Sequence, residues 1–133
     1  MNRIKGHIKT IEVSGSLSMV SVDIGHKIVL KSIVIETPET AHYLIEKNRV
    51  FLLFKETEVI ITNSLTVETS VENNIPAQIT ELEIGKLLCR VVLQAKFGVV
   101  SSIISTNAFK RLNLKVNDNV RVLIKMNEIM LSE

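Results

Sequence analysis

An internal repeat is the feature of this sequence that most constrains how the chain folds. Residues 49–61 align with residues 119–131, and apolar positions correspond almost throughout the two segments. The identical pairs include Val50 with Val120, Lys55 with Lys125, and Glu58 with Glu128. Self-similarity at a fixed offset, here of 70 residues, indicates two copies of one supersecondary unit.

The chain length fits two small modules. A chain of 133 residues accommodates two units of about 65 residues each. We expect a first domain at residues 1–62, a polar linker at 63–74 and a second domain at 75–133. Modules of this size bury little apolar surface alone, so we expect them to pack against a partner.

The first copy shows the alternation of apolar and polar residues that is typical of β-strands. Its expected strands lie at 3–13, 17–24, 27–35, 49–54 and 59–61. A phase change within the first of these predicts a long strand with a bulge or bend. Thr37 followed by Pro38 and Glu39 predicts a short helix from Pro38 to Ile45, with Thr37 as its N-cap.

The second copy follows the same order of elements. Its expected strands lie at 77–84, 87–95, 99–105, 120–124 and 129–131. Thr106 or Asn107 is expected to cap a short helix that ends at Leu112. The sequence therefore predicts an all-β protein of two tandem OB-like, five-stranded Greek-key barrels, each with one short helix between the third and fourth strands.

The composition excludes several classes of partner. A net charge of +2, four Phe, one Tyr and no Trp argue against direct nucleic-acid binding, which uses basic grooves and aromatic platforms. The single cysteine, Cys89, excludes an intramolecular disulfide, and its apolar surroundings predict a core or subunit-contact residue. No stretch approaches the roughly 18 apolar residues of a membrane-spanning helix. We therefore expect a cytoplasmic protein without membrane contact.

The motifs of common enzyme classes are absent from the sequence. There is no nucleophile elbow, phosphate loop or glycine-rich dinucleotide motif. The three histidines, His7, His26 and His42, show no metal-ligand spacing. We therefore expect no enzymatic activity, no catalytic residue and no metal site.

The first copy resembles the Mop domain of molbindins, which is related to the TOBE module of molybdate transport ATPases and molybdate-responsive repressors. The resemblance rests on Asn2-x-Ile4-Lys5-Gly6-x-Ile8-x-x-Ile11, a turn at Gly15, and the segment from Val50 to Lys55. Residues 75–131 resemble the domain more loosely. Two tandem copies imply a dimodular molbindin that binds molybdate or tungstate without a covalent cofactor. The resemblance also implies a homo-oligomer, a trimer of two-domain chains, with oxyanion sites at the contacts between modules.

The family pattern also implies which residues bind the anion. The best match is Lys55 after the fourth strand, with Lys125 as its repeat mate and Thr57 as a following hydroxyl. The family's Ser-Ala-Arg-Asn segment places its Asn at Asn2 and Asn73, its Ser at Ser70 and its Arg at Met1 and Glu72. A family hydroxyl after the third strand falls near Ser105. The expected oxyanion ligands are Lys55, Thr57, Asn2, Lys125, Ser105 and Asn73.

Each of these residues also has a purely structural interpretation. Lysines at strand ends are normally solvated, and Asn or Ser side chains often pair with nearby backbone groups. The leading hypothesis is a storage or homeostasis protein for molybdate or tungstate, which exchanges its anion with molybdate transport or cofactor-synthesis proteins. The alternative is an anion-sensing regulatory module of a molybdate transport ATPase or a molybdate-responsive repressor.

Overall fold

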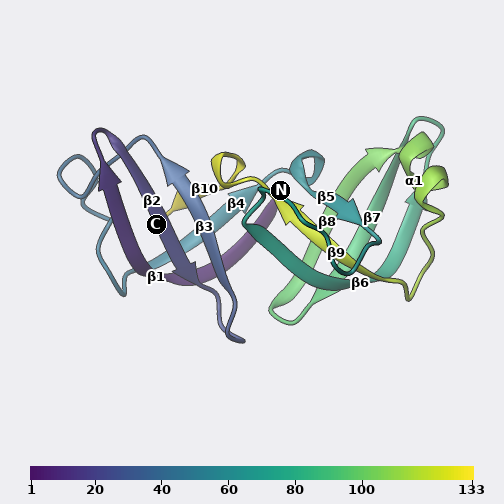
Figure 1. Cartoon of the computed structure of the whole chain (residues 1–133), viewed down its shortest axis with the longest axis horizontal. Coiled ribbons are helices and arrows are strands. Elements are labelled where there is room, and N and C mark those ends of the chain that lie inside the picture. Colours follow the sequence, from purple (N-terminus) through teal and green to yellow (C-terminus); the bar gives the residue numbers. More distant parts are fainter.

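The structure, a computed structural model, describes every residue from Met1 to Glu133. It is mostly β, with ten strands, one α-helix and two single-turn 3-10 helices, arranged as two similar lobes side by side (Figure 1). The first half contains β1 (Asn2–Ser14), β2 (Leu17–Asp23), β3 (Val29–Val34), β4 (Arg49–Phe54), η1 (Glu56–Glu58) and β5 (Ile60–Thr62). The second half contains β6 (Asn73–Ile84), β7 (Leu88–Ala95), β8 (Gly98–Ser105), α1 (Thr106–Leu112), β9 (Asn119–Ile124), η2 (Met126–Glu128) and β10 (Met130–Ser132).

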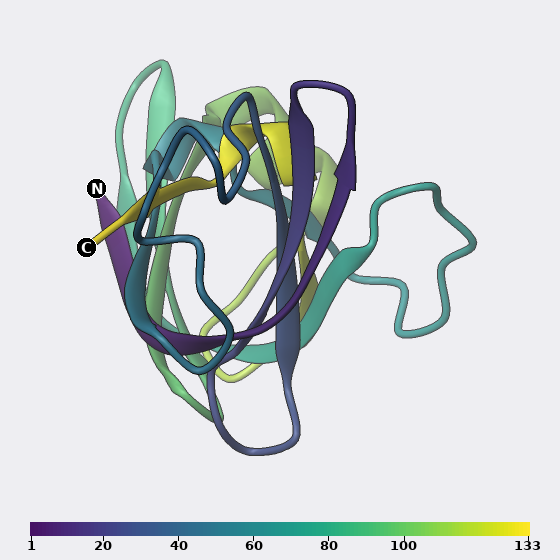
Figure 2. The same cartoon turned by 90° about the vertical axis from the view of Figure 1, so that its left-hand side faces the viewer.

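The strands form two antiparallel five-stranded sheets with matching orders. One sheet has the order β10-β4-β1-β2-β3, and the other has the order β5-β9-β6-β7-β8. Both sheets curl strongly, as Figure 2 shows for the first half, where the linker projects as a separate teal loop. The prediction of an all-β class is confirmed at this level.

Each sheet contains a strand from the opposite half of the chain. β5 follows the first repeat but pairs with β9, from Ile60 opposite Leu123 to Thr62 opposite Arg121. β10 follows the second repeat but pairs with β4, with Leu131 opposite Leu52. The expectation that each fifth strand joins the sheet of its own copy is therefore wrong. Neither half of the chain completes its sheet without three residues from the other.

The first strand of each half bends so that its two ends pair with different neighbours. In β1, residues 2–7 pair with β4 and residues 7–14 pair with β2, with a register shift between Ile8 and Thr10. The matching shift in β6 lies between Ile79 and Glu81. The predicted bulge is confirmed. It curls each sheet because an extra residue on one strand increases the local twist.

The predicted helix of the first repeat is wrong. Residues 38–45 form consecutive turns, whereas α1 occupies the corresponding place in the second repeat. In the first repeat the Thr40 hydroxyl accepts from the Thr37 N–H (2.9 Å) and donates to the Thr37 carbonyl oxygen (3.3 Å). Such local side-chain bonds compete with helical ones. α1 has better helix formers and ends on Asn113 in the left-handed conformation.

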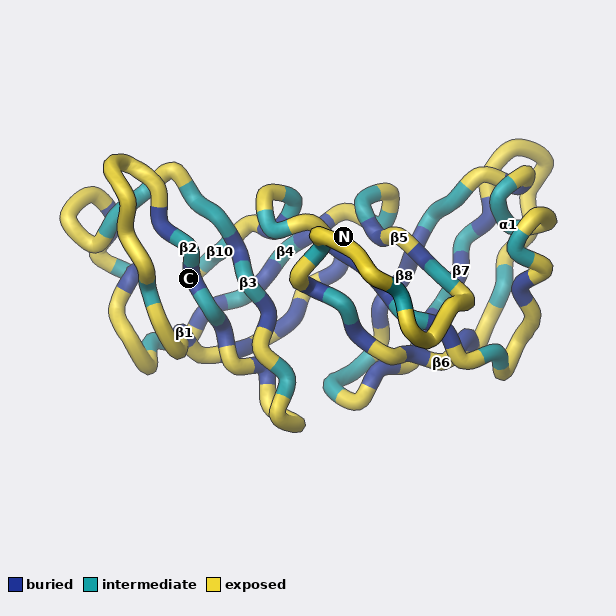
Figure 3. The backbone as a smooth tube through the Cα atoms, in the orientation of Figure 1, coloured by how far each residue is buried: buried dark blue, intermediate teal, exposed yellow.

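The core is one aliphatic cluster that continues through both lobes. Burial alternates along the strands, so buried positions lie between exposed ones, while the linker stays exposed (Figure 3). Phe54 and Leu52 of β4 and Ile124 of β9 are fully buried. Cys89 is buried as expected. No helix of the protein is long and apolar enough to cross a membrane.

Two buried asparagines clamp the halves together. The Asn2 side-chain amide donates to the Ser101 carbonyl oxygen (2.9 Å), and its oxygen accepts from the Ser101 N–H (2.8 Å). Asn73 forms the same pair of bonds with the backbone of Lys31, at 2.9 and 2.7 Å. Each asparagine thus satisfies the backbone of a strand in the opposite half.

Two buried serines repeat this arrangement one residue further along. Ser32 donates its hydroxyl to the Ile129 carbonyl oxygen (2.6 Å), and Ser102 donates to the Val59 carbonyl oxygen (2.8 Å). Both serine side chains lie in the junction and are inaccessible to solvent. Because buried polar groups are costly when unpaired, these bonds fix how the halves meet.

Replacing Asn73 with Ala should therefore destabilise the whole protein. The substitution leaves the N–H and carbonyl of Lys31 without partners, at about 1–3 kcal/mol for each buried group. We expect the free energy of unfolding to fall by about 2–6 kcal/mol, measured by urea denaturation. Asn107→Ala, at an exposed position, is the matched control and should change it by less than about 0.5 kcal/mol. Equal stability of both variants would show that the clamp contributes nothing.

Candidate functional site

A cavity of about 230 Å³ lies where the end of the linker meets η2 and β3. Ser70, Val71 and Glu72 line it from the linker, and Lys125, Met126 and Asn127 line it from the segment after β9. Ile33 of β3 provides the wall from the opposite half of the chain. The cavity is therefore a feature of the junction between halves and not of one repeat.

The cross-strand register explains why these residues meet. Asn73 lies opposite Ile124 in the pairing of β6 with β9, so the residues before Asn73 reach the residues after Ile124. Because the Asn73 side chain is anchored on Lys31, the same register also brings β3 to this place. Lys125, one of the predicted ligands, therefore lies in one cavity with Ser70, which the family pattern placed at its Ser.

A cation that sequence reasoning missed lies beside the cavity, paired with one of the residues that line it. The ammonium group of Lys31 lies 3.0 Å from a carboxylate oxygen of Glu72, and both side chains are about two-fifths exposed (37% and 46%). Lys31 precedes Ile33 by two residues on β3, so both side chains lie on one face of the strand. The repeat pattern does not single out Lys31, because the equivalent residue in the second copy is Ser101. Only the contact between the two halves places Lys31 beside the cavity.

The corresponding place in the first half is built from different residues. Lys55 directly precedes η1 and Thr57 lies within it, and both residues are exposed. Between them, Glu56 accepts a hydrogen bond from Arg90 Nε (3.0 Å), and Arg90 Nη2 donates to the hydroxyl of Ser101 (2.9 Å). The bond to Glu56 raises the pKa of Arg90. A guanidinium therefore lies beside the predicted Lys55 and Thr57, although nothing in the repeat pattern singled it out.

The other predicted ligands have structural partners. In both Asn2 and Asn73, the side-chain nitrogen and the side-chain oxygen form hydrogen bonds with backbone groups of the opposite half. Each asparagine still lies next to its predicted lysine, because Asn2 pairs opposite Phe54 and Asn73 opposite Ile124. Ser105 is the N-cap of α1 and accepts from the Ala108 N–H (3.0 Å). It does not line the cavity.

A pair of equivalent glutamates also meets at the junction. Glu58 and its repeat mate Glu128 face each other from η1 and η2, and one oxygen of Glu58 is buried without a hydrogen-bond partner. A hydrogen bond with Glu128 raises the pKa of Glu58, with smaller contributions from burial and charge repulsion, while Lys55 opposes the shift. The Glu58 carboxyl therefore holds a proton more readily in the folded protein than a free glutamate does.

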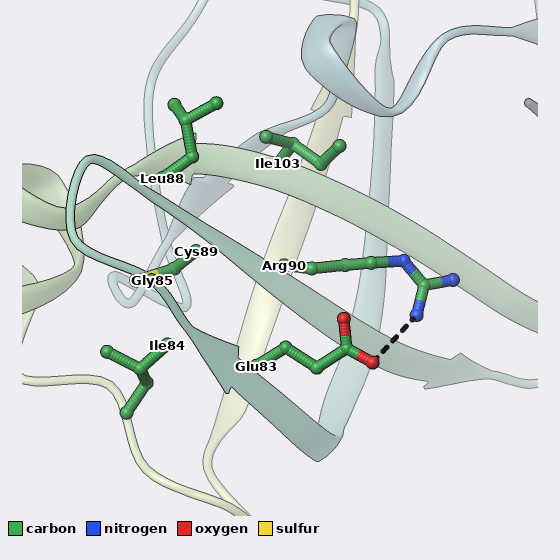
Figure 4. A pocket seen from close by; sticks show the side chains of 7 residues that line it. All are labelled: Glu83, Ile84, Gly85, Leu88, Cys89, Arg90 and Ile103. Atoms are coloured by element: carbon green, nitrogen blue, oxygen red, sulfur yellow. Dashed lines mark ion pairs between the residues drawn. The ribbon is translucent and has the colours of Figure 1, made fainter.

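Two further hollows occupy equivalent places on the outer hairpins. One is about 450 Å³ and lies beside Arg90 and Glu83, whose charged groups are 3.8 Å apart (Figure 4). The other, of about 260 Å³, lies beside Leu17 and Met19. Large apolar side chains stand exposed around both hollows: Ile84, Leu87 and Leu88 in the second half, and Val13 and Leu17 in the first.

Comparison with known families assigns the second half. Residues 69–131 match the family model of the TOBE domain. The matched segment spans nearly the whole second half of the chain, which is thus similar to a TOBE domain. The matched residues include Ser70, Glu72, Lys125 and Asn127, the polar residues that line the cavity. The predicted resemblance to the Mop and TOBE type is thereby confirmed.

Solved structures extend the fold likeness beyond the TOBE domain. The cytoplasmic molybdate-binding protein ModG, solved with molybdate bound, matches with a TM-score of 0.89 at 19% identity, over 98% of this chain and 94% of that one. A molybdate-binding protein from Sporomusa ovata matches 44% of this chain and 88% of its own, at 24% identity and a TM-score of 0.43. No curated protein sequence matches the chain.

Replacing Glu58 with Gln should stabilise the protein at neutral pH. The raised pKa means that the folded state holds this proton more tightly than the unfolded chain, so the stability it contributes is complete below the ordinary pKa of 4.5 and is lost as pH rises through the folded value. Thermal unfolding should show a higher Tm for Glu58→Gln than for the parent at neutral pH, with the gain vanishing below pH 4.5. Glu39→Gln, at an exposed position, should show no such trend. A constant gain at every pH would contradict the raised pKa of Glu58.

Proposed function

We propose that this protein reversibly binds molybdate or tungstate in the cytoplasm, for storage or homeostasis. The observation that carries the proposal is the cavity at the junction, which both Ser70 of the linker and Lys125 line. Support comes from the TOBE domain, which contains both residues, and from the fold shared with ModG.

The chemistry of the cavity suits a tetrahedral dianion. Such an anion has four oxygens and accepts many hydrogen bonds, and ammonium and hydroxyl groups are suitable donors. A site enclosed between two halves excludes part of the solvent, which strengthens each charged contact. Capture needs no covalent step and no further cofactor, so the protein acts by binding and not by catalysis.

The proposed architecture is a pair of OB-like barrels. The first is built mainly from residues 1–62 and the second mainly from residues 75–133, with 63–74 as the linker. The fifth strand of each barrel, β10 in the first and β5 in the second, comes from the other half of the chain. Because residues of both halves line the cavity, the binding unit is the pair of barrels and not a single module.

The protein is proposed to form a homo-oligomer, a trimer of two-domain chains. The exposed apolar residues around the two equivalent outer hollows supply the surface for a second copy. Contiguous exposed apolar residues are unusual on a monomer and mark interaction surfaces. The regulatory alternative, an anion-sensing module of a transport ATPase or repressor, has no specific observation in its favour.

Replacing Lys125 with Ala should weaken molybdate binding at the second-half site. A charge-assisted hydrogen bond contributes about 1.5–3 kcal/mol, so we expect the Kd to rise by about tenfold or more. Calorimetric titration with molybdate, tungstate and sulfate measures this directly. Lys115→Ala removes an exposed lysine remote from the cavity and should bind like the parent. If both variants bind alike, the cavity is not the site.

Replacing Leu87 with Asp should weaken the oligomer. Leu87 is 77% exposed at the outer hollow of the second half, and a charge there would have to be buried in the interface. Sedimentation velocity at micromolar concentration should show a smaller species than the parent. Val116→Asp, at another exposed apolar position, is the control and should keep the parental size. A parent chain that is already monomeric would contradict the proposed assembly.

A further inference from the structure

The cavity at the junction contains a negative charge of its own. Glu72 lines the cavity together with Lys125, so one carboxylate offsets the one ammonium on the lining. A dianion that enters would meet the repulsion of this carboxylate as well as the attraction of Lys125. Among the residues that line the cavity, Glu72 is therefore the one whose charge opposes anion binding.

The Glu72 carboxylate is held by Lys31 from the opposite half. The two charged groups are 3.0 Å apart. The backbone of Lys31 is fixed by both ends of the Asn73 side chain, at 2.7 and 2.9 Å, and Asn73 directly follows Glu72. The backbones of the two partners are therefore tied to each other, and only their partly exposed side chains are free to rearrange.

We propose that the Glu72 carboxylate pairs with Lys31 as an internal substitute for the oxyanion. A bound dianion then displaces this carboxylate and takes Lys31 as a further ligand. This inference rests on the proposed function and adds to it a residue that binds and a residue that sets the affinity. The site then uses two ammonium groups, Lys125 from the second half and Lys31 from the first.

The balance of charges favours this exchange. A partly exposed ion pair contributes little to stability, so breaking the contact between Lys31 and Glu72 is a small obstacle. A dianion attracts the ammonium of Lys31 about twice as strongly as a single carboxylate does at the same distance. Glu72 is 46% exposed, so its carboxylate is able to turn towards solvent when the anion arrives.

The equivalent place beside η1 has a comparable arrangement, made of Glu56 from the first half and Arg90 from the second. There a carboxylate oxygen of Glu56 lies 3.0 Å from Arg90 Nε. The neighbours of Glu56 in the chain are the exposed Lys55 and Thr57. Glu56 aligns with Met126 and not with Glu72, so the repeat does not impose this likeness. A carboxylate paired with a cation at both junctions agrees with the internal-substitute role.

Calorimetric titration of three variants of the full chain with sodium molybdate tests the proposal. Glu72→Gln keeps the size of the side chain and removes its charge, and it should bind at the second-half site about tenfold more tightly than the parent. Lys31→Gln should bind about tenfold more weakly. Glu68→Gln makes the same charge change four residues away, at an exposed position outside the cavity, and should match the parent.

The outcomes separate this inference from the function on which it rests. If Glu72→Gln and Lys31→Gln bind like the parent while Lys125→Ala is impaired, the anion site stands and the role of Glu72 is refuted. If Glu72→Gln and Glu68→Gln gain equally, only overall charge matters and the inference is wrong. If neither the parent nor Glu72→Gln binds molybdate, both the function and the inference fail. Thermal unfolding of each variant checks that Asn73 still holds the fold.

Discussion

The exchange of the short fifth strands is the constraint on which the rest of this structure depends. β5 completes the second sheet and β10 completes the first. The outer edge of β4 is therefore covered by β10, and the outer edge of β9 by β5, each from the other half of the chain. An uncovered edge leaves unpaired backbone groups and invites aggregation. Asn2, Asn73, Ser32 and Ser102 then pair with backbone groups across the same junction. Two repeats that are each too small for a stable core share one continuous cluster.

The candidate anion site follows from this junction. The exchange requires the chain to turn from β9 through η2 into β10, and that turn places Lys125 against the linker and β3. The opposing turn through η1 places Lys55 near Arg90, through Glu56. Cations, hydroxyls and carboxylates therefore collect where the halves meet, and the glutamate pair at Glu58 lies in the same junction. Binding and assembly of the two halves depend on the same few contacts.

Much of this arrangement was predictable from local patterns, and the part that was not depends on contacts between halves. Alternation located the strands and the bulge of β1 because side chains on a half-buried strand repeat every two residues. Repetition singled out Lys125 and Lys55. The partner of β5 was not predictable, because a strand of only three residues fits either sheet equally well. Lys31 and Arg90 could not be identified as site residues from the sequence, because the residues that they contact are far away in the chain. Asn2 and Asn73 were predicted as anion ligands, but their side chains bind backbone groups of the opposite half.

The most direct test of the central claim is to locate the anion in crystals of the full chain grown with tungstate, using the anomalous scattering of tungsten. The account predicts a peak in the cavity between Ser70 and Lys125, with the Lys31 ammonium turned towards the anion. Peaks confined to the outer hollows, or no peak at saturating tungstate, would contradict a site at the junction of the two halves.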